Sequence, residues 1–455
     1  MKKQHFLRAS AAAAAAVMLL LPMGGCGKTE DPTPDVSYET TDLGGRKIRI
    51  YQYGFRKDSI NNTDRGRRFM NRVAEIEKAF NCTIDLSEDD NYTAAWNAVM
   101  AGKPTFDIMQ VSAPHLFSQP ATNGVFLDLK QYDAQLHLSS DKWDKAMNEN
   151  YRLQGRQLAV STGTSLYENT ALYFNKRLVR AAGYDPEQIY QWQEEGTWTW
   201  DKFREIAAKI AKLSTASQQI YGCINNDWKL YDDLCVTSGS NWITKDDSGV
   251  HFSADKAECV RAMDFMVGMC NDKIIPDKSE FNDYKIFLEG RAGFSPEYLQ
   301  RMGDKEGYGG MQDDYGVVMF PKYDEKDEYV SINDWYQGWA LLTGIEEPEK
   351  VALVLAALTD TLYPDQAELD RINESTYLSW VRDEQSLKVF ELAAKNTYVS
   401  PLKFASPVDS QWQSKLGEIL QGKVTAAQAL QEVKNQYDVT LDELWELIDI
   451  GDDAG

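Results

Sequence analysis

Hydrophobic and polar positions follow two different periods in the first part of the chain. Residues 47–51 alternate polar and apolar side chains, which predicts a half-buried strand. Apolar residues then recur at steps of four, three and four over residues 69–80, which predicts an amphipathic helix. The predicted elements are, in order, a strand at 47–51, a helix at 69–80, a strand at 82–86, a helix at 92–101 and a strand at 106–111.

This alternation of strands and helices predicts an α/β fold in which crossover helices join parallel strands. Ligands of such sheets bind outside the carboxyl ends of the strands. The candidate positions are therefore Tyr53 and Gly54 after the first strand, and Ser112 to His115 after the third.

The pattern changes after residue 158. An extended apolar run at 171–176 leads into a predicted helix at 177–182, which Gly183 ends. Further along, Thr199 occupies a natural N-cap position, and Asp201 in the first turn suits the helix dipole. Trp198 and Trp200 flank that cap, so we predict structural roles for both. Later segments predict a helix end and strand at 287–294, a strand at 315–320 and a mostly helical region from 348 onward.

The N-terminus carries the features of an export signal. Residues 1–8 are basic and residues 9–21 are small and apolar, too short a stretch for a membrane-spanning helix. The small residues Gly24 and Gly25 directly precede Cys26. This end resembles the bacterial lipobox, in which the cysteine becomes the diacylated N-terminus after cleavage. An ordinary cleaved signal with an incidental cysteine is the alternative.

Residues 27–45 are polar, contain two prolines and show no hydrophobic period. Such a composition is typical of a flexible tether. We therefore expect a signal peptide at 1–25 and a tether at 26–45, with the protein held by lipid at the extracytoplasmic face of the cell membrane.

Composition narrows the classes of partner. The chain has 455 residues with 48 Lys+Arg and 70 Asp+Glu, a formal net charge of −22. This excess of acid repels phosphate backbones and argues against a nucleic-acid partner. The length suggests two or three domains, or one large two-lobed unit. The four histidines show no metal-ligand spacing, so we expect neither metal nor cofactor. A disulfide between Cys223 and Cys235 stays open.

The sequence offers little support for catalysis. Carboxylate pairs such as Asp232 and Asp233 could serve a glycosidase, but adjacency in sequence does not place them on a substrate. Cys223 and Cys235 have no nearby histidine that could activate a thiolate. The sequence has no nucleophile elbow, zincin motif or P-loop. We therefore predict that the protein is not an enzyme, with a carbohydrate-active enzyme as the less favoured alternative.

Five sequence features follow one another in the order found in a known protein family. The lipobox-like start, the strand at 106–111, the run at 171–176, the turn at 198–201 and the segment at 287–294 together resemble the family 1 extracellular solute-binding proteins. These are sugar-capturing lipoproteins of ABC importers, similar in fold to maltose-binding protein. The resemblance covers residues 46–445.

This resemblance implies a two-lobed, periplasmic-binding-protein-like fold of type II, with the ligand in a cleft between discontinuous lobes. It implies hinge crossings near 168–171 and 321–330, and a third near 372–380. It also implies lobes that close around the ligand by a hinge motion. The expected division is an N-terminal lobe at 46–168 and 328–375, a C-terminal lobe at 169–327, and a mainly helical segment at 376–455 that packs on the C-terminal lobe.

The chemistry of sugars directs the choice of site residues. Aromatic rings cover the apolar face of a sugar, while carboxylates and amides bond its hydroxyls. By resemblance, Glu168 lies at the first crossing, Tyr298 follows a strand that leads to the cleft, and the 335–339 cluster follows the second crossing. Trp242 is a candidate platform with a loop anchor as its alternative. The predicted ligand-binding residues are Tyr53, Ser112, Glu168, Trp242, Tyr298, Trp335 and Trp339.

These features predict a monomeric, lipid-anchored protein that captures a carbohydrate, expected to be an oligosaccharide, and delivers it to an ABC permease. A lipoprotein that presents its ligand to a sensor kinase or serves a surface glycan-binding system would share the fold and is the alternative.

Overall fold

The computed structural model describes residues 39–52, 55–88, 91–112, 124–153, 155–163, 166–225, 229–246, 249–276, 284–333, 336–399 and 408–448. Three predicted functional residues, Cys26, Tyr53 and Trp335, lie outside these ranges, as do the expected signal peptide and most of the expected tether.

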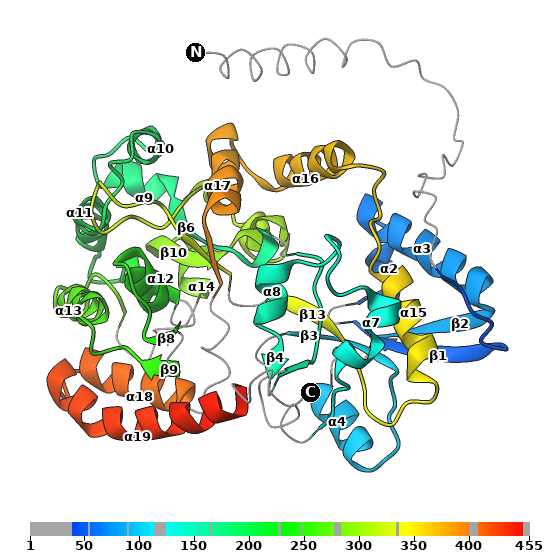
Figure 1. Cartoon of the computed structure of the whole chain (residues 1–455). Helices are drawn as coiled ribbons and strands as arrows, with labels where there is room; N and C mark the ends of the chain where they lie inside the picture. The colour runs from blue at the N-terminus through cyan, green and yellow to red at the C-terminus, as the bar shows by residue number, and fades with distance from the viewer. Residues whose placement is uncertain are drawn as a thin grey trace, which may run out of the picture.

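Two four-stranded sheets lie side by side, each among its own helices, and define two lobes (Figure 1). The N-terminal lobe has the strand order β13-β3-β1-β2. Strand β1 pairs in parallel with both β2 and β3, as the alternating pattern predicts, while β13 joins the edge antiparallel to β3. These strands are β1 (Arg46–Tyr51), β2 (Cys82–Ser87), β3 (Ile108–Ser112) and β13 (Gln337–Leu341).

The third strand begins two residues later than the sequence predicts. The carboxylate of Asp107 accepts the backbone N–H of Arg49 at 2.8 Å and also pairs with the guanidinium of Arg46 at 2.9 Å. An Asp107 side chain turned onto the neighbouring strand replaces a ladder hydrogen bond at this point, so regular pairing starts only at Ile108.

The first long helix, α3 (Asp64–Phe80), is fixed at both ends by its sequence. The Thr63 hydroxyl accepts the Gly66 N–H at 3.0 Å, and Asn81 ends the helix in the left-handed conformation. Its apolar face is buried, as predicted. The remaining N-lobe elements are α2 (Lys57–Ile60), α4 (Tyr92–Met100), η1 (Leu129–Tyr132), α7 (Asp133–Leu136), α8 (Lys145–Glu149), β4 (Arg152–Leu153), β5 (Arg156–Gln157) and α15 (Pro348–Leu358).

A buried arginine ties this lobe to a distant part of the chain. Arg72 of α3 donates to the carbonyl of Ala357, in the last turn of α15, at 3.3 Å. It also donates to the carbonyl of Thr361, just beyond that helix, at 3.2 Å. The sequence does not reveal this bond, because nearly 300 residues separate its partners.

The C-terminal lobe contains a mixed sheet with the order β11-β6-β10-β7. Strand β6 is antiparallel to both β10 and β11, whereas β10 and β7 are parallel. The strands are β6 (Thr170–Asn175), β7 (Tyr221–Cys223), β10 (Ala292–Tyr298) and β11 (Tyr315–Val318). The helices around them are α9 (Lys176–Ala181), α10 (Glu187–Glu194), α11 (Trp200–Ala211), α12 (Lys229–Thr237), α13 (Ala257–Asn271), α14 (Lys285–Leu288), η4 (Leu299–Gly303) and η5 (Tyr308–Gly310).

The tryptophans that flank the α11 cap are core residues, as predicted. Trp198 is buried and donates to the Met319 carbonyl at 3.2 Å, and Trp200 is buried and donates to the Thr237 hydroxyl at 3.1 Å. Thr199 is the N-cap residue by position, but its side chain makes no capping hydrogen bond.

This difference between two cap residues can be measured. We expect Thr63→Ala to lower the free energy of unfolding by about 1 kcal/mol, because its hydroxyl satisfies a helix N–H. Thr199→Ala should stay within about 0.5 kcal/mol, because no capping bond is lost. Urea denaturation of both variants compares them directly, and an equal loss at the two positions would contradict this assignment.

Among the described residues, three segments pass between the lobes. The first crossing runs from Val160, which bridges to Trp339 of β13, through η2 (Leu166–Glu168) into β6. The second lies later than the predicted 321–330 segment, since Lys322 still bridges to Thr199 of the C-terminal lobe. It begins with β12 (Ser331–Asn333), which precedes β13.

The third crossing is the helix α16 (Gln366–Trp380), which contains the predicted 372–380 segment and bridges the lobes in Figure 1. Glu368 near its start pairs with Arg68 of α3 at 3.1 Å. Trp380 at its end lies against Gly303 of η4, where an added Cβ would come within 2.7 Å of the indole nitrogen. Each end of α16 is thus attached to a different lobe.

After α16 the chain packs mainly on the C-terminal lobe. Helix α17 (Glu384–Lys395) contacts β11, and β14 (Thr397–Val399) pairs in parallel with β12. Helices α18 (Asp409–Leu420) and α19 (Ala426–Ile448) pack on α13 and on β9 of the hairpin formed by β8 (Ile243–Asp246) and β9 (Gly249–Phe252). Helix α19 also reaches β4 of the N-terminal lobe.

Candidate functional site

In each lobe, the carboxyl end of one strand lies beside the segment that crosses to the other lobe. Ser112, the last residue of β3, lies opposite Gln337, the first residue of β13, which arrives from the second crossing. Tyr298, the last residue of β10, lies opposite Thr170, the first residue of β6, which arrives from the first crossing. The carboxyl ends of β3 and β10 therefore lie where the lobes meet, which is where α/β sheets bind ligands.

A buried asparagine joins the crossing segments at this place. The Asn169 amide donates to the hydroxyls of Ser331 and Thr397, both at 3.0 Å, and its oxygen accepts from the Asn333 amide at 3.1 Å. The backbone carbonyl of Asn169 accepts the Leu299 N–H at 2.9 Å. One side chain thus links η2, β12 and β14, and fixes the base of the interlobe region.

Glu168 and Tyr298, two of the predicted site residues, lie on either side of this hinge. Glu168 directly precedes Asn169, and Tyr298 directly precedes Leu299, which bonds Asn169. Both side chains are half-buried. The Tyr173 hydroxyl donates to the Tyr298 carbonyl at 2.7 Å, which holds the end of β10 in place. The structure therefore brings the backbones of two residues that lie 130 positions apart in the sequence to the same hinge.

A cation covers one face of the Tyr298 ring. The Lys229 ammonium lies 4.3 Å from the ring centroid, within the range of a cation–π contact. Lys229 begins α12 and is buried beside Glu297, with 3.7 Å between ammonium and carboxylate. A saccharide that stacks on Tyr298 therefore has to use the face opposite Lys229.

Two further predicted residues share one face of the N-terminal sheet. Directly opposed residues of an antiparallel pair project to the same side, and the side alternates along the strand. Trp339 opposes Gln110 and Gln337 opposes Ser112, so Ser112 and Trp339 belong to the same face. Ser112 is buried, whereas Trp339 is partly exposed.

Trp242 is a packing residue of the C-terminal lobe in this structure. It is 1% exposed, and its indole N–H donates to the Asp232 carboxylate at 3.1 Å. Its carbonyl accepts the Ser253 N–H at 2.8 Å, next to the β8–β9 hairpin. This burial matches the loop-anchor alternative.

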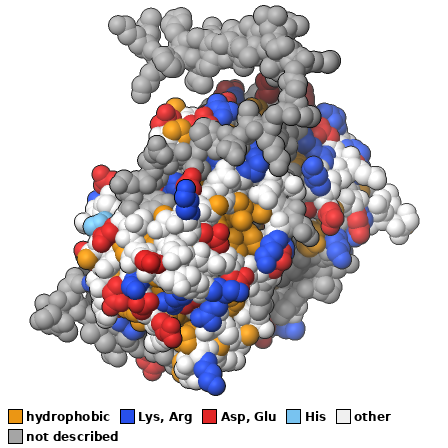
Figure 2. All heavy atoms as spheres, turned by 90° about the vertical axis from the view of Figure 1, so that its right-hand side faces the viewer, with side chains coloured by type: hydrophobic (Ala, Val, Ile, Leu, Met, Phe, Trp, Pro, Cys, Tyr) orange, Lys and Arg blue, Asp and Glu red, His pale blue; other side chains and the backbone are white. Residues whose placement is uncertain are grey.

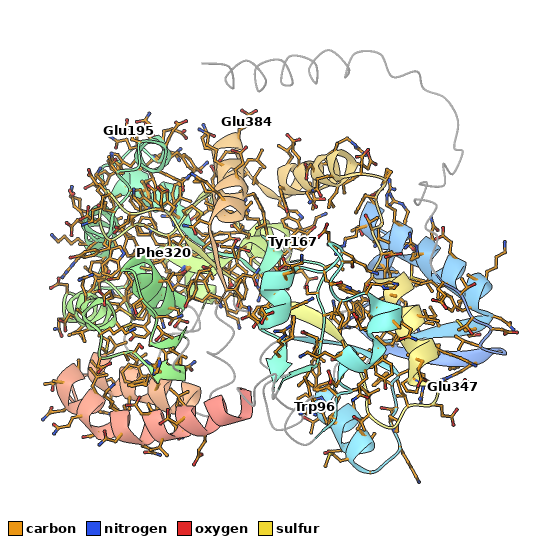
Figure 3. The ribbon with its side chains drawn as sticks, viewed as in Figure 1. Trp96, Tyr167, Glu195, Phe320, Glu347 and Glu384 are labelled. Atoms are coloured by element: carbon orange, nitrogen blue, oxygen red, sulfur yellow. The ribbon has the colours of Figure 1, made fainter. Side chains whose placement is uncertain are left out.

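The sequence analysis did not predict an aromatic cluster that lies at the third crossing. Tyr167, next to Glu168, lies between the lobes in Figure 3 and packs 4.8 Å from Trp380, measured between ring centroids. Tyr377 stacks on Phe390 of α17 at 3.9 Å. The aromatic spacing of Tyr377 and Trp380, three residues apart within the predicted crossing, was the available signal.

Buried carboxylates lie on the C-terminal side of the hinge. Three carboxylates, those of Asp232, Asp233 and Glu297, are buried on the C-terminal side, together with the ammonium of Lys229. The Asp233 carboxylate accepts the Thr170 hydroxyl at 2.7 Å beside the hinge. On the face shown in Figure 2, acidic and basic side chains are interspersed.

The thiols that the structure describes are neither paired nor activated. Cys223 and Cys235 are free thiols, so the disulfide left open by the sequence is not formed. Burial raises the pKa of both thiols, which disfavours the reactive thiolate. Within the described ranges, no cluster of three or more His, Cys, Asp or Glu could hold a metal ion. No helix among these residues is long and apolar enough to cross a membrane.

No protein-family model matches the sequence, and no curated protein matches it. Solved structures do match. A cyclic alpha-maltosyl-1,6-maltose binding protein from Arthrobacter globiformis is 17% identical with a TM-score of 0.63, over 88% of this chain and 100% of that one. UgpB from Mycobacterium tuberculosis, in complex with glycerophosphocholine, is 14% identical with a TM-score of 0.62, over 87% and 98%.

A third match carries the family name that the sequence suggested. A family 1 extracellular solute-binding protein from Bifidobacterium longum subsp. infantis is 17% identical with a TM-score of 0.58, over 87% of this chain and 100% of that one. Each match spans nearly the whole of the other chain. The protein therefore has the two-lobed fold of the solute-binding proteins of ABC transporters, as the sequence predicts.

Proposed function

We propose that this protein captures a carbohydrate between its lobes and delivers it to an ABC permease. The proposal is supported by the positions of Glu168 and Tyr298, each one residue from the Asn169–Leu299 hydrogen bond at a hinge that joins two α/β lobes. A carboxylate and an aromatic ring are the groups that bind the hydroxyls and the apolar face of a sugar. The Arthrobacter neighbour, which binds a cyclic maltosyl-maltose, supports an oligosaccharide as the ligand.

A thermal-shift screen tests this function. We expect at least one neutral oligosaccharide in a glycan panel to raise the melting temperature, because a ligand at 100 times its dissociation constant stabilises the fold by about 2.7 kcal/mol. Glycerophosphocholine belongs in the panel, since the Mycobacterium neighbour was solved with it. A shift with glycerophosphocholine and with no saccharide would move the function to that class of solute.

The proposed cellular location rests on the N-terminal sequence. We propose that Cys26 is lipidated and anchors the protein at the extracytoplasmic face of the membrane, because a short apolar segment and two glycines precede it. A lipid anchor would keep the binding protein near its permease.

Fractionation tests the anchor. We expect Cys26→Ser to release the protein from the membrane fraction or to leave it unprocessed, since the acceptor thiol is gone. The control Cys270→Ser should stay in the membrane. A Cys26→Ser protein that is cleaved after residue 25 and still sediments with membranes would overturn the proposal.

Gene neighbourhood distinguishes import from ligand presentation to a sensor or a surface glycan-binding system. Neighbouring permease genes would favour import, and a neighbouring sensor kinase gene would favour signalling. Incubation of the protein with the bound saccharide, followed by product analysis, separates both from an enzyme, because a binding protein returns the saccharide unchanged.

A further inference from the structure

Two buried tyrosines near the hinge have hydroxyl groups that no described residue bonds. Tyr151 is 0% exposed and Tyr336 is 2% exposed, and their rings pack edge to face with centroids 5.4 Å apart. Within the described part of the chain, neither hydroxyl has a hydrogen-bond partner. A buried polar group that is not hydrogen-bonded is costly and calls for an explanation.

Three other buried tyrosines of the described residues have hydrogen-bonded hydroxyl groups. Tyr173 donates to the Tyr298 carbonyl at 2.7 Å, and Tyr190 donates to the Asp383 carboxylate at 2.8 Å. The Tyr308 hydroxyl lies 2.7 Å from that of Ser295. The Tyr151–Tyr336 pair differs from these three tyrosines.

The pair lies on the N-terminal side of the lobe junction. Tyr336 directly precedes Gln337, which opposes Ser112 at the end of β3. The Tyr151 ring lies across the backbone of Gly338, where an added Cβ would come within 2.7 Å of it. Tyr336 and Gly338 alternate with Gln337 along the strand, so the phenols occupy the sheet face opposite Ser112 and Trp339.

Glu168 lies within electrostatic reach of Tyr151. Burial raises the pKa of Tyr151 well above its ordinary value, and nearby Tyr336 and Glu168 raise it further. Burial also raises the pKa of Tyr336. Both phenols are therefore protonated at neutral pH, and each can donate one hydrogen bond and accept others. The Glu168 carboxylate can only accept when it is ionised.

We propose that the hydroxyls of Tyr151 and Tyr336, together with Glu168, form a subsite that binds neighbouring hydroxyl groups of an uncharged saccharide. The inference deepens the proposed function and rests on it. Each sugar hydroxyl both donates and accepts, so it complements a phenol and a carboxylate at once. A carboxylated sugar would place its charge beside Glu168, which disfavours it.

Tyrosine-to-phenylalanine variants test the subsite through two separate measurements. The first is the melting temperature without ligand. Tyr151→Phe and Tyr336→Phe should leave it unchanged or raise it, because each removes a buried hydroxyl that has no partner. The control Tyr190→Phe should lower it, because that hydroxyl is bonded to Asp383.

The second measurement is calorimetric titration with maltotetraose, cellotetraose and trigalacturonate. We expect each Phe variant at 151 and 336 to bind the neutral saccharide that wild type prefers about five- to tenfold more weakly, as for the loss of one hydrogen bond. Tyr190→Phe should bind it as wild type does.

The outcomes separate the two hypotheses. Lower melting temperatures for both ligand-free variants would mean that the hydroxyls have structural partners, a buried water among them, and would overturn the subsite alone. Unchanged affinity in both variants would also overturn it. Preference for trigalacturonate would reject an uncharged ligand. If wild type binds none of the three saccharides, the proposed function fails for these classes and takes the subsite with it.

Discussion

Calorimetric titration of Tyr298→Ala should give a dissociation constant for the bound saccharide about 5- to 150-fold weaker than that of wild type. The loss corresponds to about 1–3 kcal/mol, the contribution of an aromatic platform judged from burial and ring-packing energies. The ring lies at the carboxyl end of β10 beside the hinge, with Lys229 over one face. Glu168→Gln keeps the shape of the neighbouring side chain and isolates the contribution of its charge.

A matched control is available on the same lobe. Tyr323 is an exposed tyrosine that packs against Trp200, near the cap of α11. Tyr323→Ala should therefore bind the saccharide with wild-type affinity. Wild-type affinity in both Tyr298→Ala and Glu168→Gln, with folding intact, would place the binding site elsewhere, and the partly exposed Trp339 would be the next residue to test.

Asn169→Ala should lower the free energy of unfolding by about 2–4 kcal/mol, among the larger effects of a single substitution. The change removes three side-chain hydrogen bonds and leaves the buried Asn333 amide without its acceptor. The hinge segments η2, β12 and β14 would lose the side chain that joins them. Guanidinium denaturation followed by circular dichroism measures the effect.

The exposed Asn271 at the end of α13 supplies the control for this variant. Asn271→Ala should stay within about 0.5 kcal/mol of wild type, as is usual for surface substitutions. A loss at Asn169→Ala no larger than that at Asn271→Ala would mean that the hinge is held by packing alone.

Local patterns in the sequence predicted much of the fold. The period-two run at β1 and the apolar face of α3 depend on burial within a few residues, so they can be seen without the rest of the chain. The β3 boundary was missed because the Asp107 side chain bonds Arg49 on another strand. Thr199 shows that cap position does not guarantee a cap bond.

The features that the sequence did not predict depend on contacts between residues far apart in the chain. The edge strand β13 joins β3 from more than 220 residues away, and β12 and β14 meet from different crossings. Nothing in the spacing of residues reveals that Lys229 covers Tyr298 or that Tyr151 lies across Gly338. Family resemblance placed Glu168 and Tyr298, whereas their common neighbour Asn169 became visible only in the structure.

The hinge region is rich in buried polar groups. Buried carboxylates, phenols and amides gather where the lobes meet, while few buried cations accompany them. Such a region suits a ligand rich in hydroxyl groups, because each hydroxyl can satisfy a donor and an acceptor in turn.

A crystal structure with the saccharide that gives the largest thermal shift tests the central claim most directly. The account predicts the sugar between the lobes, with one ring on the face of Tyr298 opposite Lys229 and hydroxyl groups within hydrogen-bond distance of Glu168. A saccharide bound on the outer surface of one lobe, with no contact to Glu168 or Tyr298, would contradict it.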